Sequence, residues 1–168
     1  CDLVVVTIKS TSNDALPSLV GPLLGKQTLV VTLQNGMGNV EALAKLLPAE
    51  RIVAGLCFVC INRISPGLVS HSAGGRMTVG EWRPDGSGRV AELVRRFKTA
   101  GIQAVAVENL EKSQWEKLVW NIPFNGLSIA SGGNDTAAIL ADPALEAQVR
   151  KLMTEIISTA RSLGHDVP

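Results

Sequence analysis

Apolar residues in the first part of the chain follow two patterns, short continuous runs and runs with helical spacing. The continuous runs at residues 3–8 and 28–33 are rich in β-branched side chains. Such runs are typical of strands buried on both faces of a parallel sheet. Further strands are predicted at residues 52–61 and 102–107, and helices at 40–47 and 88–100. This alternation indicates an α/β domain.

The stretch between residues 62 and 87 contains turn signals. Ser65-Pro66-Gly67 predicts a turn, because proline and glycine favour turn backbone angles. Residues 68–72 and 76–80 are predicted as two short antiparallel strands on either side of Gly74-Gly75.

From Asn109 onward the apolar spacing is mainly helical, with a segment at 110–122, irregular to helical structure at 127–140 and the clearest helix at 142–163. Asp142 can accept hydrogen bonds from the free N–H groups at the start of that helix, and Pro143 suits its first position. Its apolar stripe consists of Leu145, Val149, Leu152, Ile156, Ala160 and Leu163. The change of pattern predicts two domains, residues 1–108 and 109–168.

Composition narrows the class of protein. The 168 residues are 46% hydrophobic and 18% charged, with a formal net charge of +1 and no basic stripe, so nucleic-acid binding is not expected. No apolar run has the length of a membrane-spanning helix. Three cysteines are too few for a disulfide scaffold, which favours a reducing, cytoplasmic setting. The chain starts without Met inside a buried-type strand, and we expect it to be a piece of a longer protein.

The strongest chemical signal is the spacing of Lys117, Asn121 and Asn125. In a helix these positions fall within about 80° of one another and form one polar ridge. The neighbouring residues are mostly apolar, and partial burial would lower the pKa of the lysine and suit it to proton transfer. A solvated helix face is the alternative interpretation. Pro123 is expected to kink or end the helix, because it removes a backbone hydrogen bond.

A second signal is Gln34-Asn35-Gly36-Met37-Gly38-Asn39, which follows a buried-type strand. Open α/β sheets bind ligands where such strands end, and Asn35 offers both a donor and an acceptor there. Lys9 follows the first strand directly and could meet an anionic ligand. A plain strand-to-helix turn and a solvated lysine are the alternatives.

The other motifs give little evidence of a functional site. Cys57 and Cys60 form a CxxC, but positions three apart in a strand point to opposite faces, so a metal or redox site is not expected. Neither His71 nor His165 has an evident nucleophile partner, which argues against a hydrolase triad. The chain contains no GxGxxG fingerprint.

Taken together, Lys9, the QNGMGN turn, Gly74-Gly75-Arg76 and the segment Trp115-Glu116-Lys117-Leu118 with Asn121 and Asn125 resemble the ketopantoate reductase family. The resemblance extends over essentially the whole chain. It implies the C-terminal half of a Rossmann-type dinucleotide-binding domain, followed by the start of an all-α substrate and dimerisation domain. The GxGxxG segment and the later helices of the family are absent, so we expect the isolated chain to be a poor catalyst.

The resemblance also implies a reaction. It is the NADPH-dependent reduction of the 2-oxo acid ketopantoate, with Lys117 as catalytic residue and proton donor. Asn121 and Asn125 would bind substrate, Lys9 and Asn35 would contact the cofactor, and a homodimer is expected. Asn125 is followed by glycine, where the family often has proline, and Pro123 is also atypical. The alternatives are a reductase of another 2-oxo acid and a non-catalytic nucleotide-binding protein on the same fold.

Overall fold

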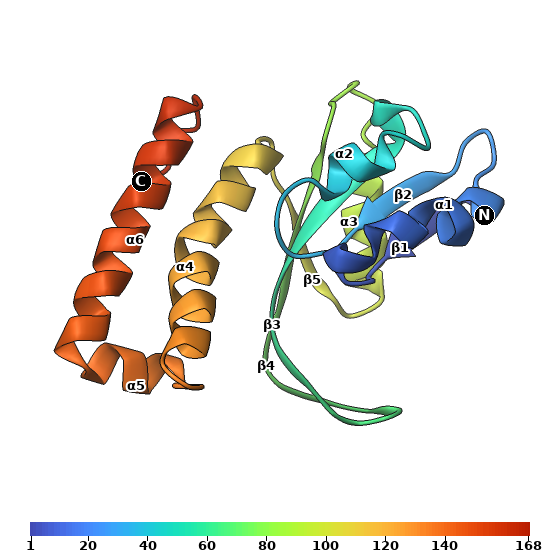
Figure 1. Ribbon diagram of the computed structural model, residues 1–168. Helices are drawn as coiled ribbons and strands as arrows, with labels where there is room; N and C mark the ends of the chain where they lie inside the picture. The colour runs from blue at the N-terminus through green and yellow to red at the C-terminus, as the bar shows by residue number, and fades with distance from the viewer. The chain divides into compact units, whose positions relative to one another are not determined.

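The computed structural model describes residues 1–168 and divides into two compact units, Cys1–Leu110 and Glu111–Pro168. The first unit combines a sheet with short helices, and the second is entirely helical (Figure 1). The division falls close to the predicted boundary at Glu108. The α/β class and the helical continuation are therefore as the sequence indicated.

The first unit is built on a mixed five-stranded sheet in the order β1-β2-β3-β4-β5. Strands β1, β2 and β3 are parallel, β4 is antiparallel to β3, and β5 is parallel to β4. The strands are β1 (Leu3–Val6), β2 (Leu29–Thr32), β3 (Ile52–Ser65), β4 (Leu68–Glu81) and β5 (Gln103–Ala106). The helical segments of this unit are η1 (Ser10–Ala15), α1 (Leu16–Val20), η2 (Gly21–Leu23), α2 (Asn39–Leu43), η3 (Ala49–Arg51) and α3 (Arg89–Thr99).

The sheet has an apolar core on each face. One core joins strand residues such as Val4 and Val30 to α1 and α2. The other joins Val31 and Val53 to Val90 and neighbouring residues of α3. Successive residues of β2 therefore serve opposite cores, which explains its continuous apolar run.

Strand β1 differs from its prediction. Val4 and Val6 are buried, but Val5 is 42% exposed, so one face of this strand is only partly covered. On that face Leu3 packs against the core that α3 forms with the sheet, whereas Val5 is not part of that core.

Strands β3 and β4 form a hairpin much longer than the sequence predicted. Each strand has 14 residues, and the turn lies between Ser65 and Leu68. The prediction that Gly74 separates two strands is wrong. Gly74 lies inside β4, at an irregularity in the pairing with β3. Its φ is +80°, and a Cβ there would lie 2.3 Å from the Phe58 carbonyl oxygen, so the close approach requires glycine.

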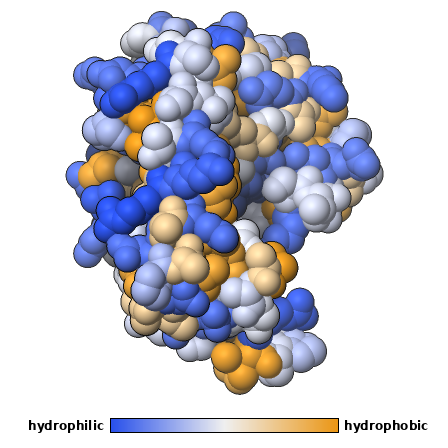
Figure 2. Space-filling model, turned by 60° about the vertical axis from the view of Figure 1, so that its left-hand side comes forward, coloured by the Kyte–Doolittle hydropathy of each residue, from blue (hydrophilic) through white to orange (hydrophobic).

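Strand β3 continues far beyond its last pairing with β2, which is Thr32 with Ala54. From Phe58 onward its residues are exposed, as are those of β4 that pair with them. We call this part of the hairpin, residues 58–76, the arm. It projects from the rest of the sheet (Figure 1), and apolar side chains gather at its end (Figure 2), including Ile64 at 61% and Val69 at 59% exposure.

The second unit consists of α4 (Leu110–Ala130, whose first residue belongs to the first unit), α5 (Thr136–Ala141) and α6 (Pro143–Ser162). Helix α4 continues through Pro123, so of the two predicted outcomes, a kink or an end, the end does not occur. Pro123 is fully buried, and Phe124 and Leu127 beside it pack against Ile139 and Val149. Burial of this apolar segment offsets the backbone hydrogen bond that proline removes.

Helix α6 begins as the sequence predicted. Oδ1 of Asp142 accepts from the backbone N–H of Ala144 at 2.8 Å and of Leu145 at 3.2 Å. Val149, Ile156 and Ala160 of the predicted stripe are buried, whereas Leu163 is 61% exposed because the helix ends at Ser162. No helix of the protein combines the length and the apolar character needed to cross a membrane.

Candidate functional site

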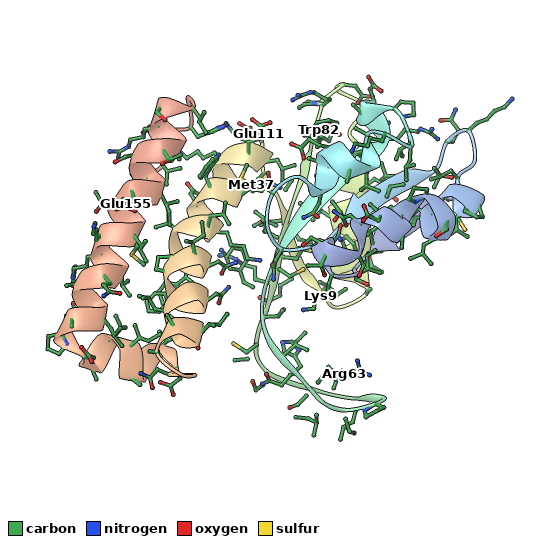
Figure 3. The ribbon with its side chains drawn as sticks, viewed as in Figure 1. Lys9, Met37, Arg63, Trp82, Glu111 and Glu155 are labelled. Atoms are coloured by element: carbon green, nitrogen blue, oxygen red, sulfur yellow. The ribbon has the colours of Figure 1, made fainter.

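Lys9 and the turn at residues 34–39 follow the carboxyl ends of two adjacent strands. Strands β1 and β2 pair in parallel, with Val6 opposite Thr32, so both ends lie at the same edge of the sheet. Lys9 is exposed and immediately precedes η1, in the position shown in Figure 3. The expectation that both segments lie at this edge is confirmed, and it is the edge where open α/β sheets bind ligands.

The backbone of the turn is shaped by two glycines. Gly36 has a φ of +91° and Gly38 a φ of +84°, a region that other residues rarely adopt. A Cβ built on either glycine would meet no atom within 4 Å, so the backbone here is open to an approaching group. Helix α2 begins directly afterwards at Asn39.

A network of side-chain amides lies beneath this turn. Gln34 Nε2 donates to the backbone carbonyl of Ile8 at 2.9 Å and to Oδ1 of Asn13 at 2.8 Å. Gln34 Oε1 accepts from the hydroxyl of Thr32 at 2.9 Å. Asn13 Nδ2 in turn donates to Oδ1 of Asn39 at 3.0 Å. Gln34 and Asn39 are both buried, so their polar groups need these partners.

The network ends on the carbonyl oxygen of Asn35. Asn39 Nδ2 donates to it at 3.2 Å, and the hydroxyl of Ser10 donates to it at 3.3 Å. Ser10 follows Lys9 directly, so this contact ties the segment that carries Lys9 to the turn that carries Asn35. The structure thus connects the two segments of this unit that the sequence singled out.

Sequence reasoning missed Asn13, and it gave Gln34 and Asn39 no role beyond the turn motif. The partners of Asn13 are 21 and 26 residues away in the chain, so no local spacing announces them. The available signal was chemical: three amide side chains near the ends of two adjacent parallel strands.

Helix α4 carries Lys117, Asn121 and Asn125 on one continuous element, which meets the condition for the predicted polar ridge. Lys117 and Asn121 are half-buried and Asn125 is exposed. The apolar neighbours are less buried than expected: Trp120 is 53% and Ile122 43% exposed. The three polar residues nevertheless share one face of the helix, because four residues are slightly more than one turn.

The first turns of α4 are tied to the end of the chain. The ring of Trp115 lies 6.2 Å from that of His165, centre to centre, and His165 Nε2 is 3.9 Å from a carboxylate oxygen of Glu111. The backbone N–H of His165 donates to the carbonyl of Ala160 at 2.9 Å. His165 therefore packs against the first turns of α4, where its ring lies beside Trp115, two residues before Lys117.

The turn in the first unit suits a dinucleotide cofactor. The open glycine backbone permits close approach of a flat or phosphorylated group, and the exposed Lys9 offers a positive charge for an anionic one. The exposed Asn35 carries an amide that matches the donor and acceptor pattern of a carboxamide.

Two family descriptions match the chain. Residues 1–84 match "Ketopantoate reductase PanE/ApbA", and residues 109–168 match "Ketopantoate reductase PanE/ApbA C terminal". A 2-dehydropantoate 2-reductase from Nostoc sp. is 39% identical over the whole chain, which corresponds to 54% of that enzyme. The chain thus spans about half the length of the curated relatives it matches.

Solved structures agree with this grouping. A 2-dehydropantoate 2-reductase from Geobacter metallireducens superposes with a TM-score of 0.91 and is 44% identical, over 95% of this chain and 52% of that one. A D-mandelate dehydrogenase solved with NADH and anilino(oxo)acetate also superposes with a TM-score of 0.91, over 99% of this chain and 54% of that one. At 23% identity the second likeness concerns the fold alone.

Proposed function

The chain belongs to the ketopantoate reductase family, a family of oxidoreductases, and we propose that the protein reduces ketopantoate to pantoate with NADPH. The observation that carries the proposal is the lysine and two asparagines on one face of α4. A ketone reductase needs a proton donor for the developing oxyanion and neutral groups to orient the substrate, and this face supplies both.

Lys117 is the proposed proton donor. Hydride addition to the keto carbon converts the carbonyl oxygen into an alkoxide, which an ammonium group stabilises and then protonates. Its half-buried position limits competition from water, which strengthens its attraction for the alkoxide. The lysine becomes neutral in this step and regains a proton from solvent.

Asn121 and Asn125 are proposed to bind the 2-oxo acid. Their amides donate to oxygen atoms and accept from hydroxyl groups without adding charge. One helix carries them together with Lys117, so their spacing is set by the backbone of a regular element.

Asn35 and Lys9 are proposed to hold the cofactor at the carboxyl edge of the sheet. When bound, NADPH supplies the hydride. Asn35 would contact its carboxamide end, and Lys9 would meet negative charge on the cofactor or the substrate. The amide network beneath the turn supports this role because it fixes the backbone from which Asn35 projects.

The test is turnover by the full-length protein. NADPH oxidation should be followed with ketopantoate and with a panel of 2-oxo acids that differ in side-chain size and branching, and with NADH in parallel. The proposal predicts the highest kcat/KM for ketopantoate with NADPH. A higher kcat/KM for another oxo acid would show that ketopantoate is not the preferred substrate. Cofactor binding without turnover of any oxo acid would favour a non-catalytic nucleotide-binding protein.

A further inference from the structure

In the amide network beneath the Asn35 turn, only one assignment of hydrogen-bond donors and acceptors is possible. It ends on two backbone carbonyls, those of Ile8 and Asn35, and a carbonyl can only accept. Gln34 must therefore turn its NH₂ group toward Ile8, and Asn39 must turn its NH₂ group toward Asn35. Asn13 lies between them, where it has to accept from Gln34 and donate to Asn39.

Asn13 is the member that joins the two ends of the turn. Gln34 precedes the turn and Asn39 begins the helix after it, and the Asn13 side chain bonds to both, at 2.8 and 3.0 Å. Asn13 itself comes from η1, the segment that follows Lys9. One half-buried side chain thus connects both ends of the cofactor-binding turn to the loop that carries the other proposed cofactor ligand.

We propose that Asn13 is a positioning residue for this reductase, which acts through Asn39 and Gln34 to hold the Asn35 backbone in place. The inference rests on the proposed function, since it assigns Asn13 to the geometry of the Asn35 contact. Without the Asn13 amide, Asn39 loses the donor that orients it, which loosens the hydrogen bond from Asn39 Nδ2 to the Asn35 carbonyl. The Asn35 side chain then samples a wider range of positions, which weakens a contact that depends on orientation.

Four variants separate the hydrogen bonds of Asn13 from the packing of its side chain. N13A removes both bonds. N13D keeps the shape and the acceptor for Gln34 but places a second acceptor against Asn39 Oδ1, so it should be at least as harmful as N13A. N39A and the double variant N13A/N39A test whether the two residues act as one unit. Gln27, an exposed amide in the loop before β2 at the opposite edge of the sheet, supplies the matched control Q27A.

The full-length variants should be compared in kcat, KM for ketopantoate, NADPH affinity, melting temperature and hydrogen exchange of a peptide covering residues 33–40. We expect N13A to lower kcat/KM about tenfold, with the same division between kcat and KM as N35A. The loss of kcat/KM in the double variant should be about as large as that in the more impaired of its two single variants. Q27A should have the kcat/KM of the wild type. Exchange in the turn should rise in N13A but not in Q27A.

Two results would overturn the inference. One is unchanged kcat/KM and exchange in N13A while N35A and K117A are impaired, which leaves the proposed function intact. The other is better activity in N13D than in N13A, because N13D lacks the donor to Asn39, and the hydrogen bond from Asn13 to Asn39 would then not be what matters. If the wild type turns over no oxo acid, the proposed function fails, and the exchange measurement still decides whether Asn13 holds the turn.

Discussion

Lys117 and Asn121 lie one helical turn apart on α4, and both side chains are half-buried. Their relative position is therefore set by helix geometry and does not depend on any loop. Side chains held in this way keep a fixed spacing toward a ligand, which is what a proton donor and an orienting amide need.

Replacing Lys117 with alanine removes the only group of the α4 ridge that can donate a proton. We expect K117A to lower kcat by about 100-fold or more, because the alkoxide loses both its counter-charge and its proton source. NADPH affinity should change little. Lys151, whose side chain is 77% exposed on α6, provides the control K151A. Equal kcat in K117A and the wild type would remove Lys117 from the mechanism.

Asn121→Ala separates binding from stability. Alanine favours a helix over asparagine by about 0.5 kcal/mol, so the melting temperature should stay the same or rise. KM for ketopantoate should nevertheless increase by up to about tenfold, because an oriented hydrogen bond is lost. Steady-state kinetics and thermal denaturation on one sample measure both effects. Gln148→Ala, at an exposed amide on α6, should raise stability without moving KM, and a KM shift there of the same size would contradict the assignment.

The Asp142 cap sets the start of α6. Asp142→Ala leaves two backbone N–H groups without their acceptor and should cost about 1 kcal/mol in the free energy of unfolding. Asp142→Asn retains the side-chain oxygen and should cost less. Urea denaturation followed by circular dichroism compares the two, and equal losses would show that the carboxylate charge and not the hydrogen bond is what matters.

Glu92 on α3 gives the protein an acid-sensitive contact. Hydrogen bonds from Arg95 and Arg96 lower the pKa of Glu92 from its ordinary value of 4.5 to about 2. Because this pKa is lower in the folded state, the stabilisation is fully present above about pH 4.5 and is lost as the pH falls toward 2. The melting temperature of the wild type should therefore fall more steeply over this range than that of E92Q. An NMR titration of the Glu92 carboxyl with a midpoint near its ordinary value would refute this.

Structural features that depend on residues close together in the sequence could be predicted. Asp142 and Pro143 announce the start of α6 because a cap acts on the next turn of the helix. The apolar runs locate β1 and β2, and parallel pairing then places Lys9 and Asn35 at one edge. The spacing of Lys117, Asn121 and Asn125 predicts that they share one face of α4.

Features that depend on distant partners were not predictable. Pro123 predicts a kink or an end of the helix, but α4 continues through it, and Phe124 and Leu127 beside it pack against residues of α5 and α6. Gly74-Gly75 resembles a turn, and only the register with Phe58 shows it to be an irregularity within a strand. Asn13 has no recognisable motif, since its role arises from two contacts across the fold.

The arm of the β3–β4 hairpin has a practical consequence. Arg63 is exposed near its end (Figure 3), beside a break in the pairing between Arg63 and Ser65. A protease that cleaves after arginine would find an accessible bond there. Both fragments would remain anchored, because β3 is hydrogen-bonded to β2 and β4 to β5 on either side. The bond after Arg63 is therefore a suitable point at which to insert a reporter domain.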